Sequence, residues 1–267
     1  MSAQTELEQL LGLAIRLARD AGAIQRASYE AVQQIESKSQ PNDLVTEVDR
    51  ACEAHLVGEL ARERPHDSVL AEEGTGVDRP GATYRWVIDP LDGTTNYAHG
   101  YPRFACSIAV EREGAQAIGV VYDPLLDELY HAVIGGGAQR NARPIRVSRE
   151  TALNRALLCT GFAYDKAVAN DDITREFREF LIKARDLRRD GSAALDLCYV
   201  AAGRFDGFWE YKLAPWDVAA GTLIVAEAGG RVTDTAGGHA YRSGLTVLAS
   251  NGAIHGAMLE VLAAARS

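Results

Sequence analysis

Cysteine is scarce in this chain, and no two cysteines stand close together. The four that occur, Cys52, Cys106, Cys159 and Cys198, are spread over 267 residues without any C-x-x-C pair. This spacing argues against both a cysteine zinc site and a disulfide framework. We expect the four thiols to be small core side chains of a protein in the reducing cytoplasm.

Basic residues are also in short supply. Lysine and arginine total 28 against 37 aspartates and glutamates, which gives a formal net charge of -9. General binding to nucleic acids or to anionic membranes depends on basic patches, so neither is an expected partner. An acidic chain can still bind an anionic ligand if a bound divalent metal supplies local positive charge.

The sequence offers no segment for export or membrane insertion. Residues 1–8 are acidic where a secretory signal would be basic, and no apolar run approaches the roughly 18 residues that a membrane span needs. We therefore expect a cytoplasmic protein without a membrane partner.

Hydrophobic periodicity predicts helices first and then strands. Apolar residues at three- and four-residue steps between Leu7 and Ile24 predict a long amphipathic helix. A second helical pattern begins at Val48, with Thr46 as its N-cap and Asp49 in its first turn. From residue 104 to residue 133, apolar and polar residues alternate around glycines, which predicts an antiparallel meander.

Beyond about residue 150 the predicted strands and helices alternate, as they do in α/β proteins. A chain of 267 residues, 47% of them hydrophobic, can bury a large core. We predict an N-terminal α+β half (1–150) with the meander, and a C-terminal α/β half (151–267). No low-complexity linker separates them, so we expect the two halves to pack as one unit with a crevice between them.

One stretch of the N-terminal half combines features of a metal and phosphate site. An apolar strand ends in the sequence Asp89-Pro90-Leu91-Asp92-Gly93-Thr94-Thr95-Asn96. Asp89 and Asp92 can turn toward one point across a tight bend, and such hard oxygen ligands suit Mg²⁺. Gly93 lets the backbone approach a ligand, and a helical turn starting at Thr94 would present N–H groups to an anion. An ordinary strand followed by an Asp/Gly turn is the alternative.

Three further acidic residues stand at the ends of predicted elements. Glu72 and Glu73 close a short strand, and Asp217 begins a helix. Taken singly, these are explained by a solvated loop and by a helix-start acid. Together with Asp89 and Asp92 they give several carboxylates at element ends, which repel one another unless a cation lies nearby.

Several separated motifs share one resemblance. They are Leu44–Asp49, Ala71–Glu73, Asp89–Tyr97, Gly191–Ala194 and Pro215–Gly221. In this order, and over nearly the whole chain, they resemble the inositol monophosphatase family, and most closely the bacterial inositol-1-monophosphatases of the Mg²⁺-dependent, lithium-sensitive phosphatase superfamily. The resemblance implies a homodimer and a layered α/β/α/β/α sandwich of the inositol monophosphatase and fructose-1,6-bisphosphatase type, combining α+β and α/β organisation.

The resemblance also implies roles for individual residues. It implies two to three Mg²⁺ ions per site, whose ligands are Glu72, Asp89, the Leu91 carbonyl, Asp92 and Asp217. The implied catalytic group is Thr94 with Asp49, which orient or activate the attacking water, together with Glu72. The implied substrate contacts are Asp92, Gly93, Thr94, Ala193, Ala194, Glu210 and Asp217. Lys38 is implied to lie on a loop over the site.

The resulting prediction is a phosphoric monoester hydrolase. We expect it to convert inositol 1-monophosphate to inositol and phosphate with metal-activated water. Fructose 1,6-bisphosphate and histidinol phosphate, substrates of sister enzymes, are alternatives, as is a regulatory role based on protein interaction. Two local alternatives also stay open: Gly191–Ala194 can serve tight helix packing, and Arg188 with Arg189 is expected to be a solvated or interface pair.

Overall fold

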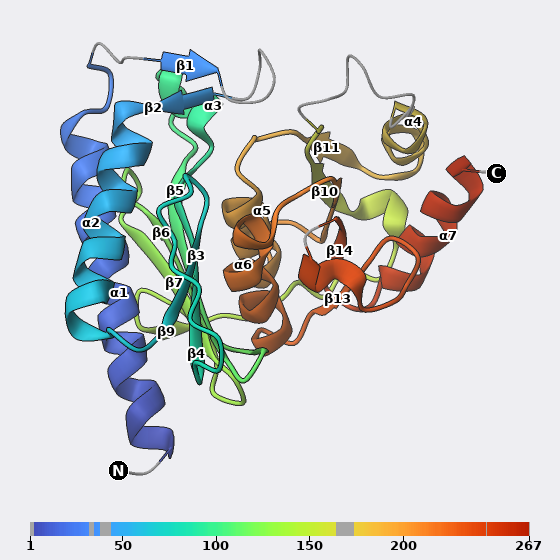
Figure 1. The fold of residues 1–267 in the computed structure, drawn as a ribbon. Helices are drawn as coiled ribbons and strands as arrows, with labels where there is room; N and C mark the ends of the chain where they lie inside the picture. The colour runs from blue at the N-terminus through green and yellow to red at the C-terminus, as the bar shows by residue number, and fades with distance from the viewer. Residues whose placement is uncertain (1–2, 32–34, 38–43, 164–173, 244, 267) are drawn as a thin grey trace.

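The computed structural model describes residues 3–31, 35–37, 44–163, 174–243 and 245–266. Five layers follow one another in space (Figure 1). They are α1 (Ala3–Ala27) with α2 (Glu47–Glu63), a seven-stranded sheet, α5 (Ala193–Ala201) with α6 (Pro215–Glu227), a five-stranded sheet, and α4 (Thr174–Lys183) with α7 (His255–Arg266). The expected α/β/α/β/α sandwich is confirmed. Lys38 lies outside the described residues, so its expected place over the site stays a prediction.

The seven-stranded sheet runs in chain order, β3 to β9. Only its first pair, β3 with β4, is parallel, and every later pair is antiparallel. The predicted meander is therefore confirmed. The strands are β3 (Ser68–Ala71), β4 (Tyr84–Asp92), β5 (Ala105–Arg112), β6 (Ala115–Asp123), β7 (Glu128–Val133), β8 (Gly137–Arg140) and β9 (Arg143–Pro144).

The five-stranded sheet is mixed, in the order β11-β10-β12-β14-β13. β10 is parallel to both of its neighbours, whereas β14 is antiparallel to both of its own. These strands are β10 (Leu157–Thr160), β11 (Asp186–Arg188), β12 (Gly207–Tyr211), β13 (Arg231–Thr233) and β14 (Thr246–Ser250). The remaining elements are β1 (Ile35–Ser37), β2 (Leu44–Thr46), α3 (Thr94–Ala98), η1 (Leu153–Arg155) and η2 (Ala240–Ser243).

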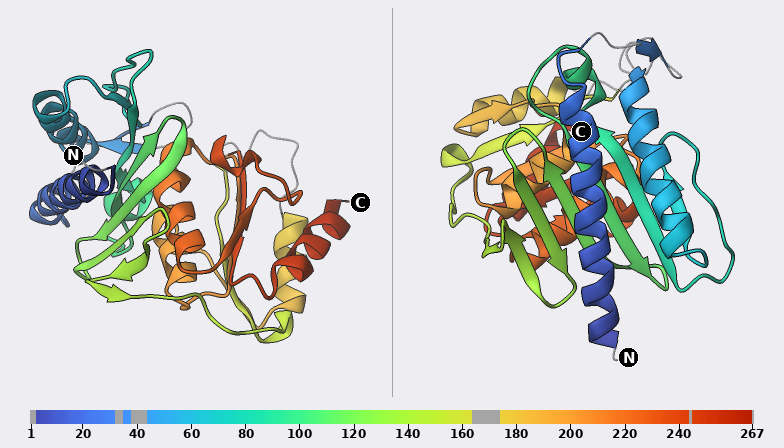
Figure 2. Two further views of the ribbon diagram at one scale, coloured as in Figure 1. Left: turned by 90° about the horizontal axis from the view of Figure 1, so that it is seen from below. Right: turned by 90° about the vertical axis from the view of Figure 1, so that its left-hand side faces the viewer.

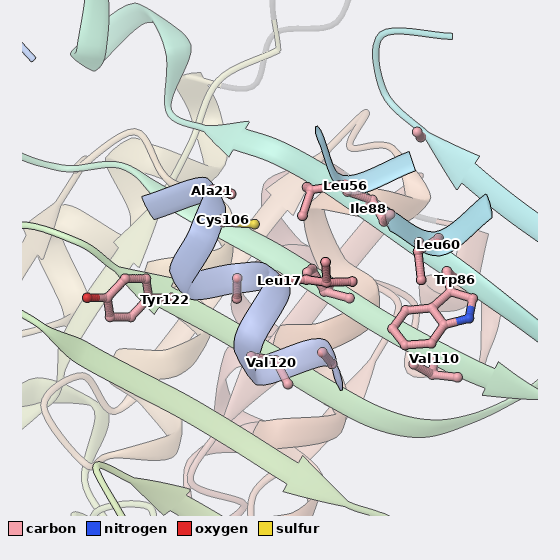
Figure 3. Packing of buried hydrophobic residues seen from close by; sticks show 14 of the residues in the cluster. Leu17, Ala21, Leu56, Leu60, Trp86, Ile88, Cys106, Val110, Val120 and Tyr122 are labelled. Carbon is pink, nitrogen blue, oxygen red and sulfur yellow. The ribbon is translucent and has the colours of Figure 1, made fainter. Parts of the chain in front are cut away.

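The outer helices α1 and α2 cover one face of the seven-stranded sheet (Figure 2). The apolar stripe of α1 puts Leu17 and Ala21 against the sheet, and α2 adds Leu56 and Leu60 (Figure 3). At Gly22 a Cβ atom would lie only 2.5 Å from the Tyr122 ring, so glycine permits the close approach of α1 to β6. Burial of these side chains is the main stabilising term, at about 25 cal/mol per Å² of apolar surface.

A second core fills the space between the two sheets, where α5 and α6 lie. Small residues keep this layer thin. A Cβ atom at Gly119 of β6 would lie 2.6 Å from the Ala220 carbonyl of α6, and one at Gly221 would lie 2.7 Å from Leu197 of α5. The central helices thus lie directly on the sheet of the first half. The division into halves at about residue 150 stays a prediction.

All four cysteines are buried and unpaired with one another, as expected from their spacing. Among the described residues, no helix combines the length and the apolar composition that crossing a membrane requires.

Candidate active site

A pocket of about 430 Å³ lies where the two halves of the chain meet. The seven-stranded sheet side contributes Glu72, Asp89 and the run from Leu91 to Thr95. The other wall is formed by Phe162, Ala163, Arg189, Gly191, Ala193, the run from Glu210 to Ala214, Trp216 and Asp217. Nearly every site residue expected from the sequence is brought together here. Asp49 and Ala194 are not in the wall but contact residues that are, as described below.

A β-bulge makes the central motif of this wall possible. Side chains of a regular strand alternate between faces, so Asp89 and Asp92, three residues apart, would point to opposite sides. Asp89 pairs with Ser107 and Asp92 with Ala105, so β4 carries one more residue than β5 between these two pairs. The extra residue in β4 restores a common direction, and both carboxylates line the pocket. Pro90, which has no N–H to donate, lies within this irregular stretch.

Each aspartate of the pocket is oriented by donors at one of its oxygens. The Leu91 N–H donates to Asp89 Oδ1 at 3.0 Å, and the Ala214 N–H donates to Asp217 Oδ2 at 2.6 Å. The second interaction caps α6, whose first turn includes Asp217. A hydrogen bond to one oxygen fixes the orientation of the whole carboxylate group, so the other oxygen is positioned to bind a ligand.

Asp92 is held from the opposite half of the chain. The Ser192 hydroxyl and the Ala194 N–H donate to Asp92 Oδ2 at 2.6 and 2.8 Å. Ser192 is also the N-cap of α5, where its side chain accepts from the Leu195 N–H. The small residues of Gly191–Ala194 therefore serve both packing and the site, because Ala193 lines the pocket and Ala194 contacts Asp92.

Ionising all of the carboxyl groups of the pocket at once is energetically unfavourable. Burial raises the pKa of Asp89 and Asp217 well above the usual value, and the neighbouring carboxylates, first of all Glu72, raise both further. Burial also raises the pKa of Asp92 to about 6, although its bonds from Ser192 and Ala194 oppose the rise. Such mutual repulsion in a low dielectric is relieved by protons or by a bound cation.

The donor set fits a hard divalent cation. It consists of carboxylate oxygens, and Glu72 is the first of the neighbouring charges that raise the pKa of Asp89, so a cation bound between them would relieve their repulsion. No three histidine, cysteine or acidic side chains of the described residues are already set around one point as metal ligands. Binding would therefore draw these side chains together, with rotations at Glu72, whose side chain is only half-buried.

Thr94, in the pocket wall, forms a buried pair with Asp49 behind it. The Thr94 hydroxyl donates to Asp49 Oδ1 at 2.8 Å and lies 3.1 Å from the Leu91 carbonyl. Asp49 is held by the N-terminus of α2, because its Oδ2 accepts from the N–H and the hydroxyl of Thr46. Thr46 is the expected N-cap, and a capping box with Asp49 completes it. A hydroxyl whose proton is engaged by Asp49 can accept a hydrogen bond from water in the pocket.

Sequence reasoning missed the residue that positions Glu72. Glu53 of α2 is fully buried and accepts from the Glu73 N–H at 2.7 Å. It also accepts from the N–H and hydroxyl of Thr75, at 2.9 and 2.8 Å. Glu53 thus holds the turn that follows β3 and carries Glu72. Its place four residues after Asp49 on the same helix is the only sequence signal of this role.

Asn96 is a second positioning residue without an assigned role in the sequence analysis. Its amide donates to the Arg103 carbonyl at 2.7 Å and to the Asp190 carbonyl at 2.8 Å. The second bond ties α3 to the segment that leads into Ser192 and the start of α5. Glycine is required before α3, because a Cβ atom at Gly93 would lie 2.7 Å from the Arg103 carbonyl.

The wall from the C-terminal half also contains Glu210, on β12. Burial raises the pKa of Glu210 to about 8, and Arg189 partly opposes this rise. Its carboxyl group lies against Gly161, where any Cβ atom would collide with it. Trp209 and Tyr211, on either side of Glu210, are buried sheet residues.

Arg188 and Arg189 are both exposed, which agrees with the expected solvated or interface pair. Arg188 is exposed and pairs with Asp186 at 2.6 Å. Arg189 instead lines the pocket, with its guanidinium 5.9 Å from the centre of the Phe162 ring. Arg188 is the last residue of β11, and Arg189 follows the end of the strand.

A model of the inositol monophosphatase family matches residues 6–267 of the chain. The chain belongs to the inositol monophosphatase family. Relatives in this family carry two kinds of name. The Nus factor SuhB of Pseudomonas aeruginosa is 42% identical over 261 residues, covering 96% of each chain. The inositol-1-monophosphatase of a Synechocystis species is 42% identical, covering 97% of this chain and 91% of the relative.

Solved structures of inositol monophosphatases share the fold. The enzyme from Anabaena sp. PCC 7120 superposes with a TM-score of 0.88 at 41% identity and covers 97% of both chains. The structure of SaIMPase-II bound to inositol monophosphate has a TM-score of 0.79 at 30% identity, covering 94% of this chain and 92% of that one. The layered architecture expected from the motifs is therefore that of the inositol monophosphatases.

Proposed function

We propose that this protein is a Mg²⁺-dependent phosphoric monoester hydrolase with inositol 1-monophosphate as its leading substrate. The observation that carries the proposal is the convergence of Glu72, Asp89, Asp92 and Asp217 from two halves of the chain on one pocket. Three of these carboxyl groups have raised pKa values, so holding them together in ionised form lowers the stability of the folded protein. A divalent cation would convert this repulsion into binding energy.

The chemistry requires charge neutralisation before anything else. A phosphate monoester and hydroxide are both negative, and the uncatalysed reaction is among the slowest in biology. When bound by these carboxylates and the Leu91 carbonyl, two to three Mg²⁺ ions would supply that neutralisation and a bound water of lowered pKa. The protein's own share is to hold the ligands, the phosphate and the water in line.

Thr94 and Asp49 are proposed to orient the attacking water. With its own proton directed at Asp49, the Thr94 oxygen accepts a hydrogen bond from a water in the pocket. This leaves the lone pair of that water to face the phosphorus atom. The N–H groups of Gly93 and Thr94 are proposed to bind the phosphate oxygens, since both residues line the same wall.

The leaving group is proposed to lie against the C-terminal half. Glu210 and Ala193 line this side of the pocket, and Ala194 fixes Asp92 beside it. A carboxyl group can form hydrogen bonds with the hydroxyls of a sugar-like ring and thereby select it. The relative SaIMPase-II was solved with inositol monophosphate, which supports this choice of substrate. Fructose 1,6-bisphosphate and histidinol phosphate are the alternative substrates.

A regulatory role is the second candidate, because several relatives are named Nus factors. Such a role would use the outer surface of the fold and is compatible with catalysis. The proposal also includes a homodimer, inhibition by lithium and a cytoplasmic location, all implied by the family resemblance.

Phosphate release tests the enzymatic proposal directly. We expect the purified protein with Mg²⁺ to hydrolyse members of a panel of phosphorylated polyols, sugars and histidinol phosphate, and to stop when Mg²⁺ is chelated. Asp89→Asn and Asp217→Asn should abolish hydrolysis and leave the circular dichroism spectrum unchanged. Full activity in either variant would overturn the site. Capture of a stoichiometric protein partner, with no hydrolysis by the wild type, would favour the regulatory role.

A further inference from the structure

Arg103 is a nearly buried arginine in the segment between α3 and β5. Its side chain is only 11% exposed. Its Nη1 donates to the Tyr199 hydroxyl at 2.7 Å, and its guanidinium lies 4.4 Å from the centre of the same ring. Tyr199 belongs to α5, so this side chain connects the N-terminal half of the chain to a central helix. The proposed metal and substrate contacts give Arg103 no task.

Three carboxylates surround the guanidinium of Arg103. They belong to Asp190, Asp196 and Asp123, at 3.8, 3.9 and 4.0 Å from its nitrogens. No other cation of the described residues lies within 4 Å of Asp123 or Asp196, whose side chains are each 2% exposed. Burial and the charge of Asp190 raise the pKa of Asp196 well above its usual value, and Arg103 opposes this rise. Removal of Arg103 would leave buried carboxylates without a countercharge.

Two of these carboxylates flank the stretch that holds Asp92. Asp190 lies two residues before Ser192, and Asp196 lies two residues after Ala194. Between them, the Ser192 hydroxyl and the Ala194 N–H donate to Asp92 Oδ2. A guanidinium that attracts both flanking carboxylates therefore fixes the position of the two donors that lie between them.

The main chain of Arg103 supports the other side of the same contact. Its carbonyl accepts from the Asn96 amide, which also donates to the Asp190 carbonyl. The same carbonyl lies so close to Gly93 that a Cβ atom there would be 2.7 Å away. Arg103 thus contacts both the turn that follows Asp92 and the segment that leads into α5.

We propose that Arg103 is a positioning residue of the active site: its guanidinium fixes the start of α5, and with it the two donors that hold Asp92. The inference rests on the proposed hydrolase function and adds a residue that acts through Asp92, a proposed Mg²⁺ ligand. Arg103 itself is not among the described residues that line the pocket. Its loss should therefore weaken Mg²⁺ binding without removing any group that touches the substrate.

Amide hydrogen exchange of the metal-free protein tests the positioning without catalysis. Arg103→Lys keeps the charge but loses the planar guanidinium, so the amides of residues 192–196 should exchange at least about threefold faster relative to those of β6. Arg204→Gln is the matched control. Arg204 lies at the same 4.4 Å from the centre of the Tyr199 ring, but its carboxylate partner is Glu128 on β7. This control should leave the ratio of exchange rates unchanged.

Titration of Mg²⁺ into the metal-free variants gives a second readout. Arg103→Gln should raise the Mg²⁺ dissociation constant by roughly 10- to 100-fold, as is typical when the support of a metal ligand is lost. Arg103→Lys should raise it less, and Arg204→Gln should leave it unchanged. At saturating Mg²⁺ the kcat of both Arg103 variants should return to within about threefold of the wild-type value. If Arg103→Gln does not fold, Arg103→Lys decides the question.

A double variant tests the route through the donors of Asp92. If Arg103 acts by holding Ser192, then Arg103→Lys combined with Ser192→Ala should raise the Mg²⁺ dissociation constant by less than the product of the two single effects. Full multiplication of the two effects would show that Arg103 acts by another route.

The inference is overturned if folded Arg103→Lys exchanges these amides or binds Mg²⁺ as the wild type does. It is also overturned if Arg204→Gln has the same effects as the Arg103 variants, or if the double variant shows full multiplication. In each of these cases the hydrolase proposal stands. Absence of hydrolysis with every ester would overturn the proposed function instead, and hydrogen exchange would still decide whether Arg103 fixes the donors of Asp92.

Discussion

Glu53 offers the sharpest test of how the fold positions a metal ligand. Its buried carboxylate accepts three hydrogen bonds from the turn that carries Glu72, two from Thr75 and one from Glu73. We predict that Glu53→Ala lowers the free energy of unfolding by about 2–4 kcal/mol. This loss in the free energy of unfolding is small for three hydrogen bonds to a charged group. The reason is that Thr75 is exposed, so its donors can form hydrogen bonds with water instead.

The loss should be visible in two measurements. For a chain of this size, 2–4 kcal/mol corresponds to a fall in melting temperature of roughly 4–16 °C. Release of the turn also frees Glu72, so the Mg²⁺ concentration for half-maximal activity should rise roughly 10- to 100-fold, as is typical when the support of a metal ligand is removed. Both are measured well below the melting temperature of the variant, where the protein remains folded.

Glu63→Ala is the matched control on the same helix. Glu63 forms exposed ion pairs with Arg16 and Arg62 on the outer surface, so its loss should cost less than about 1 kcal/mol and leave the Mg²⁺ dependence unchanged. If folded Glu53→Ala retains the wild-type Mg²⁺ dependence, then Glu53 does not position Glu72 and the reasoning fails.

Three further predictions concern the pocket itself. Burial raises the folded-state pKa of Asp92 to about 6 and that of Glu210 to about 8, above their usual values of 3.8 and 4.5. The folded state therefore binds more protons than the unfolded state, so the melting temperature in EDTA should fall as the pH rises from about 4 to 8. Saturating Mg²⁺ should offset this fall. A melting temperature in EDTA that does not change with pH would contradict these pKa shifts. Thr94→Val should lower kcat by roughly 10²- to 10⁴-fold while Thr94→Ser stays within about tenfold, and equal rates would exclude the hydroxyl from water positioning. Gly161→Ala should lower kcat/KM by displacing Glu210, whereas Gly256→Ala, which has open space around it, should not; identical kinetics would show that Glu210 does not contact the substrate.

The local parts of the site could be predicted from the sequence. Asp89, Asp92, Gly93 and Thr94 lie within six residues, so their proximity follows from chain connectivity. The N-cap at Thr46 is equally local, and the structure confirms it. Local spacing, however, does not fix the direction of a side chain. The bulge that turns Asp89 and Asp92 to one side depends on pairing with β5, which begins 13 residues beyond Asp92.

The long-range parts could not be derived from spacing. In the sequence, Glu53 is indistinguishable from other acidic residues on a helix. Only the packing of the fold brings it into contact with the turn after β3. Arg189 is exposed as expected, but nothing in the sequence tells which of two adjacent arginines faces a pocket. The positive φ of Lys212 is equally hidden, since its sequence position lacks the glycine that usually marks such a conformation.

The central claim is that carboxylates from both halves of the chain form one Mg²⁺ site. Isothermal titration of Mg²⁺ into metal-free wild type and Asp217→Asn tests it most directly, because Asp217 lies far from the Asp89 motif in the sequence and beside it only in the fold. The account predicts that the wild type binds Mg²⁺ with release of protons, and that Asp217→Asn loses at least one bound ion. Equal stoichiometry and affinity in the two proteins would contradict it.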